Sequence, residues 1–244
     1  MDDPCEQSFV ENQDTCEVLF AYHDRTKHHF NRQARSLGYM DWANQPNPFR
    51  YYEGALQTKL DVHRQPRPLP YDRLYEKDVL PAQPLNLETL ADFFRYSLAL
   101  SAWKQYGSSR WALRINPSSG NLHPTEAYAL LPPLTDVSDA PTLCHYASEL
   151  HALERRASLS EEVWQHLTNL LPDGSFLLGL SSILWREAWK YGERAFRYCQ
   201  HDIGHALAAL RCSAVLCGWD LQLVRGWSTV DVAMLLGLDR SDGF

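Results

Sequence analysis

The stretch NPSSGNLHPTEAY, residues 116–128, sets prolines, serines, a glycine and an asparagine directly before a run that reads as a buried strand, residues 127–131. A Pro-Ser-Ser-Gly-Asn turn leaves several backbone N–H groups pointing outward beside short hydroxyl and amide side chains. Such a surface can hydrogen-bond the edge of a planar heteroaromatic ring or hold an anion. An ordinary loop between two elements is the alternative, and loop chemistry alone favours it.

The composition narrows the class of protein. The chain has 244 residues, 45% of them hydrophobic, which is enough for one sizeable core or two small ones. Its formal net charge is −7 without a long run of like charge, so we expect no nucleic-acid partner. No apolar stretch approaches the roughly 20 residues that cross a bilayer, and the acidic N-terminus lacks a secretory pattern. Six cysteines never form CxxC, which is typical of reduced thiols, and we expect a cytoplasmic protein.

The chain divides into two parts by composition. Residues 1–20 look loosely ordered, residues 22–35 suggest a polar helix, and seven of the fourteen prolines fall between residues 46 and 84. Because proline fixes φ and removes a donor, we expect that proline-rich stretch to be irregular and to form no sheet. We therefore predict an irregular N-terminal extension, residues 1–85, packed on a folded domain of residues 86–244.

The second part shows regular patterns. Asn86 can cap a helix whose apolar residues recur at helical spacing, and Ser160 can cap another. Further expected elements are a strand at 127–131, a strand at 175–184, a long helix at 192–217, a strand at 220–224 and a short helix at 229–236. The long helix is apolar on most sides, which predicts a place in the middle of the domain. Alternating helices and strands predict one layered α/β or α+β domain.

Two motifs carry a resemblance to a known family. PSSGNLHP followed by a strand resembles the flavin motif of the FMN-dependent nitroreductase superfamily, and is closer still to its SagB-type branch, the azoline dehydrogenases. WREAWKYGERAFRYCQHDIGHAL, residues 185–207, is similar to that branch's Lys-Tyr-Gly-x-Arg-x-x-Arg-Tyr segment. The resemblance covers residues 86–238, with a weaker likeness at 22–54. It implies an α+β, three-layer α/β/α fold with a mostly antiparallel sheet around a buried central helix.

The resemblance also implies FMN as cofactor. The residues that it places at the isoalloxazine ring are Pro117, Ser118, Ser119 and Asn121. His123 stands where related reductases often have a glutamine near the flavin. Arg114 is the candidate for the ribityl phosphate or the pyrimidine edge, because arginine contacts phosphate with two parallel donors; a solvated surface arginine is the alternative. The Arg-x-Ser-x-Arg phosphate clamp of many reductases is absent before Asn86, so the anchor of the phosphate stays open.

Lys190 and Tyr191 match the pair implicated in proton removal by azoline dehydrogenases. Oxidation of a thiazoline removes a proton from one carbon and passes a hydride to flavin N5. Arg186 and Arg194 would favour the neutral amine of Lys190 by like-charge repulsion, so that it can act as a base. A solvated lysine and a packed tyrosine form the alternative.

His201 and His205 have the spacing of the zinc-protease motif HExxH, with Asp202 in place of the glutamate. Arg197 shares their stripe of the helix, and no third ligand is indicated. We therefore expect no metal site.

We expect an FMN-dependent oxidoreductase that takes hydride from a small molecule, a peptide or NAD(P)H, with azoline-to-azole oxidation on peptides as one such reaction. The alternative is a degenerate, non-catalytic flavin-binding or assembly module. Related flavin sites form between two copies of the fold, so we expect a homodimer or a tandem half as partner. The sequence stops at GLDRSDGF, which predicts that the C-terminal strand of the family is missing.

Overall fold

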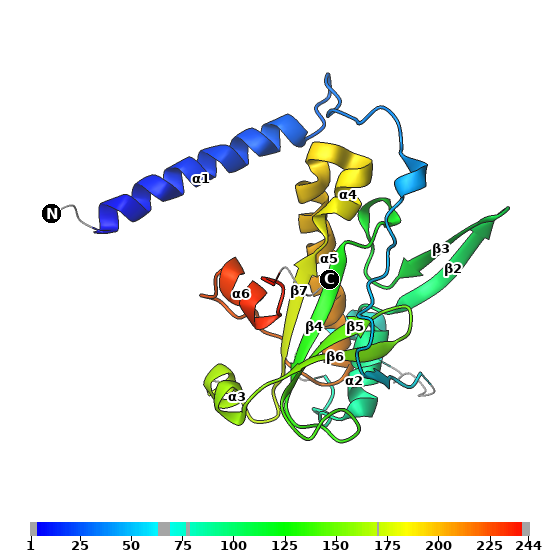
Figure 1. Ribbon diagram of the computed structural model, residues 1–244, viewed down its shortest axis with the longest axis vertical. Helices are drawn as coiled ribbons and strands as arrows, with labels where there is room; N and C mark the ends of the chain where they lie inside the picture. The colour runs from blue at the N-terminus through cyan, green and yellow to red at the C-terminus, as the bar shows by residue number, and fades with distance from the viewer. Residues whose placement is uncertain (1–3, 63–68, 77–78, 170, 241–244) are drawn as a thin grey trace.

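A five-stranded antiparallel sheet forms the centre of the molecule (Figure 1). The computed structural model describes residues 4–62, 69–76, 79–169 and 171–240. In spatial order the strands are β1 (Gln57–Lys59), β6 (Ala152–Ser158), β5 (Thr142–Ala147), β4 (Thr125–Leu131) and β7 (Leu177–Ser182). All seven residues of β4 are buried, which agrees with a strand covered on both faces.

Helices cover both faces of this sheet. On one face, α2 (Leu87–Arg95) and α5 (Ala195–Leu216) pack their apolar residues against the alternate β4 positions 127, 129 and 131. On the other face, α3 (Glu161–Thr168) and α6 (Thr229–Leu235) pack with Tyr128 and Leu130. The expected α+β class with three layers is confirmed.

Local capping signals define several helix starts. The side chain of Asn86 accepts from the backbone N–H of Thr89 at 2.9 Å, and the Thr89 side chain reciprocates, which closes a capping box. Ser228 and Asp231 close a second capping box at α6, and the Ser160 hydroxyl caps α3 by accepting from the Val163 N–H alone. The predicted positions of these helices and of β4 are therefore correct.

The N-terminal extension differs from its prediction. A 23-residue helix, α1 (Pro4–Thr26), replaces the loose segment expected at 1–20, and it ends well before residue 35. Figure 1 shows α1 reaching away from the body. Its last turns meet the rest of the chain, where the Tyr22 hydroxyl donates to the Glu193 carbonyl at 2.8 Å. The prediction that residues 46–84 contribute no strand is wrong, because β1 pairs with β6. The division at residues 85 and 86 stays a prediction.

The long helix predicted at 192–217 is confirmed: a short 3-10 turn at Gly192–Arg194 leads directly into α5. A separate helix that was not predicted, α4 (Leu184–Tyr191), precedes this turn. Gly192 adopts φ of 55°, and a Cβ there would lie 2.8 Å from the Leu37 side chain, so glycine is needed at this corner. One side of α5 is buried, whereas Phe196 and Leu207 on its outer side are 45% and 41% exposed. In this chain the helix covers the sheet and is not enclosed by it.

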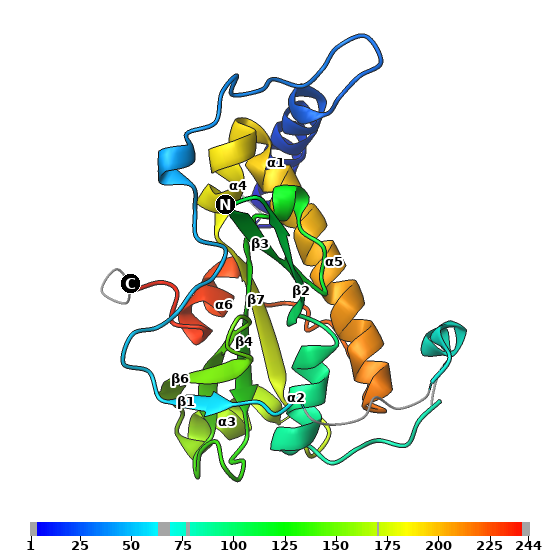
Figure 2. The same cartoon turned by 90° about the vertical axis from the view of Figure 1, so that its right-hand side faces the viewer.

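A separate two-stranded ribbon, β2 (Leu100–Tyr106) and β3 (Ser109–Arg114), projects from the body to the right in Figure 1 and therefore faces the viewer in Figure 2. Most of its residues are exposed, and its second strand leads directly into residues 116–123. No pattern in the sequence predicted this ribbon or the β5–β6 hairpin. The strand predicted at 220–224 is wrong, because residues 219–227 form no helix or strand in the part of the chain described. No helix in the described ranges combines the length and the apolarity that a bilayer span requires.

Candidate functional site

A single buried carboxylate organises the loop at residues 117–123. Asp202, fully buried on α5, accepts from the Ser118 hydroxyl at 2.8 Å and from the Ser119 hydroxyl and backbone N–H at 2.9 Å each. The Ser118 hydroxyl accepts in turn from the backbone N–H of His123 at 2.8 Å. Three donors satisfy the carboxylate, so the loop is fastened to the helix rather than left to solvent.

The backbone of this loop turns through left-handed conformations. Gly120, Asn121 and His123 have φ of 62°, 60° and 50°, and a hydrogen bond of 2.8 Å from the Asn121 amide to the Ala112 carbonyl supports the turn. Pro117, which precedes the loop, is exposed.

The two sequence motifs meet at Gly120. A Cβ on Gly120 would lie 2.7 Å from the Tyr191 hydroxyl and 3.1 Å from the Lys190 Nζ. The structure therefore brings the proline-serine loop and the Lys-Tyr pair into direct contact, although about 70 residues of chain separate them. Only glycine leaves room for both side chains.

His123 is buried and neutral. Burial, together with the neighbouring positive charge of Arg114, lowers the pKa of His123 to about 3. Its Nε2 lies 3.1 Å from the Asn121 side-chain oxygen and 3.4 Å from the Ala112 carbonyl. Both neighbours are acceptors, so we assign the proton to Nε2. Its Nδ1 then presents a lone pair that has no donor among the described residues.

Arg114 is not a solvated surface residue. It is 7% exposed, and its Nη1 and Nη2 donate to the carbonyls of Thr125 at 3.1 Å and Pro48 at 2.7 Å. Its Nε is buried without a partner in the described part of the chain. In this arrangement the guanidinium joins the start of β4 to the N-terminal extension.

Tyr191 and Glu187 lie on the inner side of α4. The ring of Tyr191 contacts that of Tyr198 at 4.2 Å between centroids, and burial followed by the nearby Glu187 carboxyl raises the pKa of Tyr191. Glu187 is 0% exposed, and neither of its oxygens has a hydrogen-bond partner among the described residues. Burial, followed by the charge of Asp202, raises the pKa of Glu187 to about 8.

Behind the loop runs a buried chain of charged side chains. Arg186 Nη1 donates at 2.6 Å both to the His123 carbonyl and to Glu126. The other Glu126 oxygen lies 3.0 Å from His145 Nε2, and His145 Nδ1 lies 2.9 Å from Glu154. Burial alone would lower the pKa of His145, but hydrogen bonds to the two glutamates outweigh it, so that the pKa is raised.

Sequence reasoning gave no role to Asp202, Glu187 or His145. A signal existed for Asp202, because it shares the helical stripe of Cys199, Ala206 and Leu210 and is the one acid on that apolar face. His145 lies in a fully buried strand without alternation, where no local pattern marks it.

Comparison with solved structures identifies the fold. No protein-family model and no curated protein matches the chain. A proposed nitroreductase from Anabaena variabilis superimposes with a TM-score of 0.70 and 24% identity, over 90% of this chain and 43% of its own. The chain has a nitroreductase-like fold. It spans less than half the length of the Anabaena protein.

Two further structures share the nitroreductase-like fold. A proposed nitroreductase from Ralstonia eutropha gives a TM-score of 0.52 and 16% identity over 80% of this chain and 93% of its own. The E. coli microcin synthetase McbBCD complex, with truncated pro-MccB17 bound, gives 0.53 and 16% over 98% and 89%.

His201 and His205 are exposed on the outer side of α5. The described residues contain no group of three His, Cys, Asp or Glu side chains that could bind a metal.

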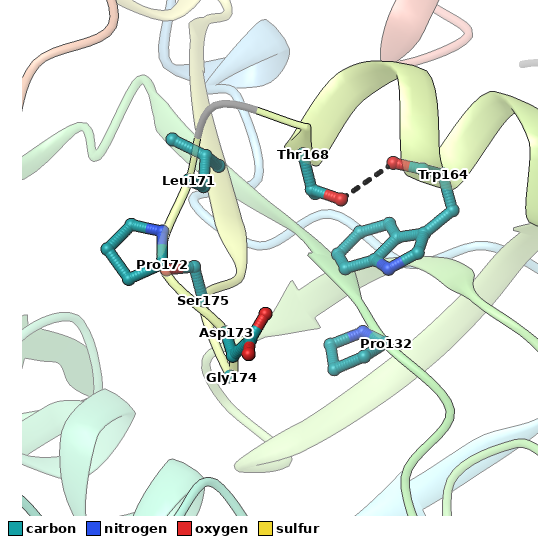
Figure 3. A pocket seen from close by; sticks show the side chains of 8 residues that line it. All are labelled: Pro132, Trp164, Thr168, Leu171, Pro172, Asp173, Gly174 and Ser175. Carbon is teal, nitrogen blue, oxygen red and sulfur yellow. Dashed lines mark hydrogen bonds between the residues drawn. The ribbon is translucent and has the colours of Figure 1, made fainter.

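A small pocket lies elsewhere on the nitroreductase-like fold (Figure 3). It measures about 120 Å³ and lies between Pro132, Trp164 and Asp173, where β4 ends and β7 begins. The loop with Gly120 precedes the opposite end of β4, since Thr125 pairs with Ser182 and Leu130 with Leu177. The pocket is smaller than the roughly 300 Å³ of ordinary cofactor sites, and it is remote from the loop.

Proposed function

We propose that the chain is an FMN-dependent oxidoreductase of the SagB type, with the loop at residues 117–123 at its centre. The observation that carries the proposal is the contact of Gly120 with Tyr191 and Lys190. The loop at 117–123 is suited to bind a planar ring, and Lys190 and Tyr191 are suited to transfer protons. Two-electron chemistry on a bound ring requires that such groups lie next to each other.

The residues of the site fit a flavin in part. His123 Nδ1 is a buried acceptor without a partner in the described ranges, and the Glu187 carboxyl is buried there without a partner as well. A flavin offers a ring N–H and ribityl O–H groups of the kind that such polar atoms need. Pro117, Ser118, Ser119 and Asn121 would hold the ring edge through the backbone of the loop, and His123 would contribute its unpartnered Nδ1. Arg114 already donates to two carbonyls, so a role at the phosphate would require those bonds to exchange.

The chain's own residues would manage the proton. When bound, FMN supplies an acceptor for the hydride of the substrate. Lys190, whose Nζ lies at the loop, would take the proton from the oxidised carbon. The Tyr191 hydroxyl, also at the loop, would hold the substrate or relay that proton.

The substrate proposal follows the Lys-Tyr pair. We propose oxidation of a peptide azoline, with NAD(P)H as the competing hydride donor. The structural similarity to a microcin synthetase complex that has a truncated pro-MccB17 bound supports a peptide substrate.

A second copy of the fold is the proposed partner, as a homodimer or a tandem half. Apolar side chains stand exposed on α5 and α6, among them Phe196, Leu207, Val230 and Met234, which are 41–65% exposed. Large apolar side chains exposed on helices in this way are candidates for burial against a second copy.

One observation favours a second function, a non-catalytic binding module. The hydroxyls of Ser118 and Ser119 are bound to Asp202, and the Asn121 amide is bound to Ala112. Side chains that would otherwise face a cofactor are therefore already satisfied within the protein.

Flavin binding separates these two functions. FMN titrated into the purified chain should lose its free fluorescence at a saturable site. Lys190→Ala and Tyr191→Phe should keep this affinity and lose most of the rate of flavin reduction by an azoline substrate, because they are proposed to handle its proton. His201→Gln, on the exposed side of α5, is the matched control. Binding without any reduction would favour the module, and no FMN binding would reject the cofactor.

A further inference from the structure

Glu187 is an unusual carboxyl group. It is completely buried on α4, and neither oxygen meets a donor within the described residues. A buried carboxylate without partners is costly, because it has lost the solvation that water supplied. A side chain kept in such a place is either neutral or waits for a group that completes it.

Its neighbour Asp202 shows the opposite condition. Asp202 is buried to the same extent, yet it accepts from three donors of Ser118 and Ser119. Of the two neighbouring acids, Glu187 is therefore the one whose oxygens lack donors among the described residues. Two carboxyl groups in such different surroundings are a recurring basis of acid and base assignments in enzymes.

The charged groups that act on Glu187 are Lys190, one turn further along α4, and Asp202 on α5. Glu187 acts in turn on Tyr191 of α4 and Cys199 of α5. Positions i+3 and i+4 lie on the same side of a helix as position i. Glu187 thus lies beneath the pair that contacts Gly120.

We propose that Glu187 is a positioning residue for Lys190 and Tyr191, a neutral carboxylic acid whose ionisation switches the pair off. While Glu187 keeps its proton, it places no negative charge beside the Lys190 side chain. Once it ionises, its negative charge attracts Lys190 and holds that side chain against α4. This inference rests on the proposed function for its role in catalysis, but the charge relation between the three groups stands without any cofactor.

The protonation of Glu187 can be observed by infrared spectroscopy. At pH 6–7 the wild type should show a carboxylic-acid C=O band that disappears as the pH passes about 8. Glu187→Gln, which matches the neutral acid in shape, should lack this band. Glu193→Gln, a nearby exposed acid paired with Arg25, should keep it. Identical spectra for wild type and Glu187→Gln at pH 6 would overturn the inference.

The effect on Lys190 can be measured without flavin or substrate. Acylation by an amine-reactive reagent, quantified by mass spectrometry of peptides, should give a ratio of Lys190 to exposed Lys104 that falls in the wild type above about pH 8. In Glu187→Gln this fall should disappear. A ratio that is independent of pH in the wild type would reject the switch. Failure of FMN to bind would reject the proposed function alone.

Discussion

Asp202 Oδ1 lies 2.9 Å from both the backbone nitrogen and the hydroxyl oxygen of Ser119. One carboxylate oxygen thus receives two donors from a residue 83 positions earlier in the chain. The relationship fixes the loop on α5 before any ligand arrives, and preorganised donors and acceptors of this kind are what a binding site needs. The conformation of the loop therefore depends on one acceptor atom, Asp202 Oδ1.

Asp202→Asn tests this attachment. The amide retains the shape of the carboxylate but replaces one acceptor oxygen by a donor, which would face the N–H and O–H donors of Ser118 and Ser119. We expect a loss of about 2–4 kcal/mol in the free energy of unfolding, measured in urea. Asp173→Asn, at an exposed position, should change it by less than about 0.5 kcal/mol. Equal stability of Asp202→Asn and the wild type would contradict the proposed attachment.

Gly120→Ala tests the contact between the two motifs. The added methyl group would meet the Tyr191 hydroxyl at 2.7 Å, and φ of 62° strains any residue with a Cβ. We expect a loss of about 2 kcal/mol in unfolding free energy. Tyr191→Phe removes the hydroxyl, so the double variant should regain part of this loss, with a coupling of about 1 kcal/mol. Strict additivity would show that the two residues do not touch in solution.

His145 should make stability depend on pH in the neutral to alkaline range. Its folded pKa is raised above the ordinary 6.5, so its contribution is complete below 6.5 and is lost as pH rises through the folded pKa. His145→Gln should lack this loss and should lower the unfolding free energy by about 3 kcal/mol at pH 6, because Glu126 and Glu154 lose their shared cation. Thermal unfolding between pH 6 and 9 measures both effects, with the exposed His205→Gln as control. A parallel pH profile in His145→Gln and wild type would reject the assignment.

Glu187 should act in the opposite sense, as a cost to folding. Because its folded pKa is raised from 4.5 to about 8, the wild type loses stability as the pH rises from 4.5 through 8. Glu187→Gln does not bear this cost, so we expect it to be more stable than the wild type by about 2–4 kcal/mol at pH 8 and equal to it near pH 4. Urea unfolding at several pH values decides; a destabilised Glu187→Gln at pH 8 would show that the carboxylate has partners.

Local signals in the sequence predicted part of the fold correctly. The caps at Asn86 and Ser160 and the apolar run of β4 depend on neighbours within a few residues, and all three appear where expected. The isolated β2–β3 ribbon lacked such a signal, because most of its side chains are exposed on both faces and show no alternation. The tertiary contacts of α1 could not be predicted either, because its last turns form hydrogen bonds with Glu193 and Arg197, which lie far along the chain.

The candidate site divides in the same way. The resemblance to SagB-type proteins predicted functional roles for the loop and for Lys190 and Tyr191. Their contact at Gly120 agrees with a shared site. The buried acids Asp202 and Glu187 could not be assigned, because their partners or lack of partners are set by packing between α4, α5 and the loop. The local sequence around an acidic residue does not show which donors will surround it in the folded protein.

The buried chain from Arg186 to Glu154 has a consequence for the order of folding. Glu126 meets Arg186 across 60 residues, and Glu154 receives the Gln57 amide across 97 and the Tyr52 N–H across 102. Contacts of such large separation form late, since the loops that they close must first lose their entropy. Until the N-terminal extension packs on the sheet, the Glu154 carboxylate lacks the hydrogen bonds from the Tyr52 N–H and the Gln57 amide. Strands β4, β5 and β6, which are joined by hairpins, should therefore pair before Glu154 has its hydrogen bonds from residues 52–57. The slowest step should be the pairing of residues 52–57 with the edge of the sheet that these strands have already formed.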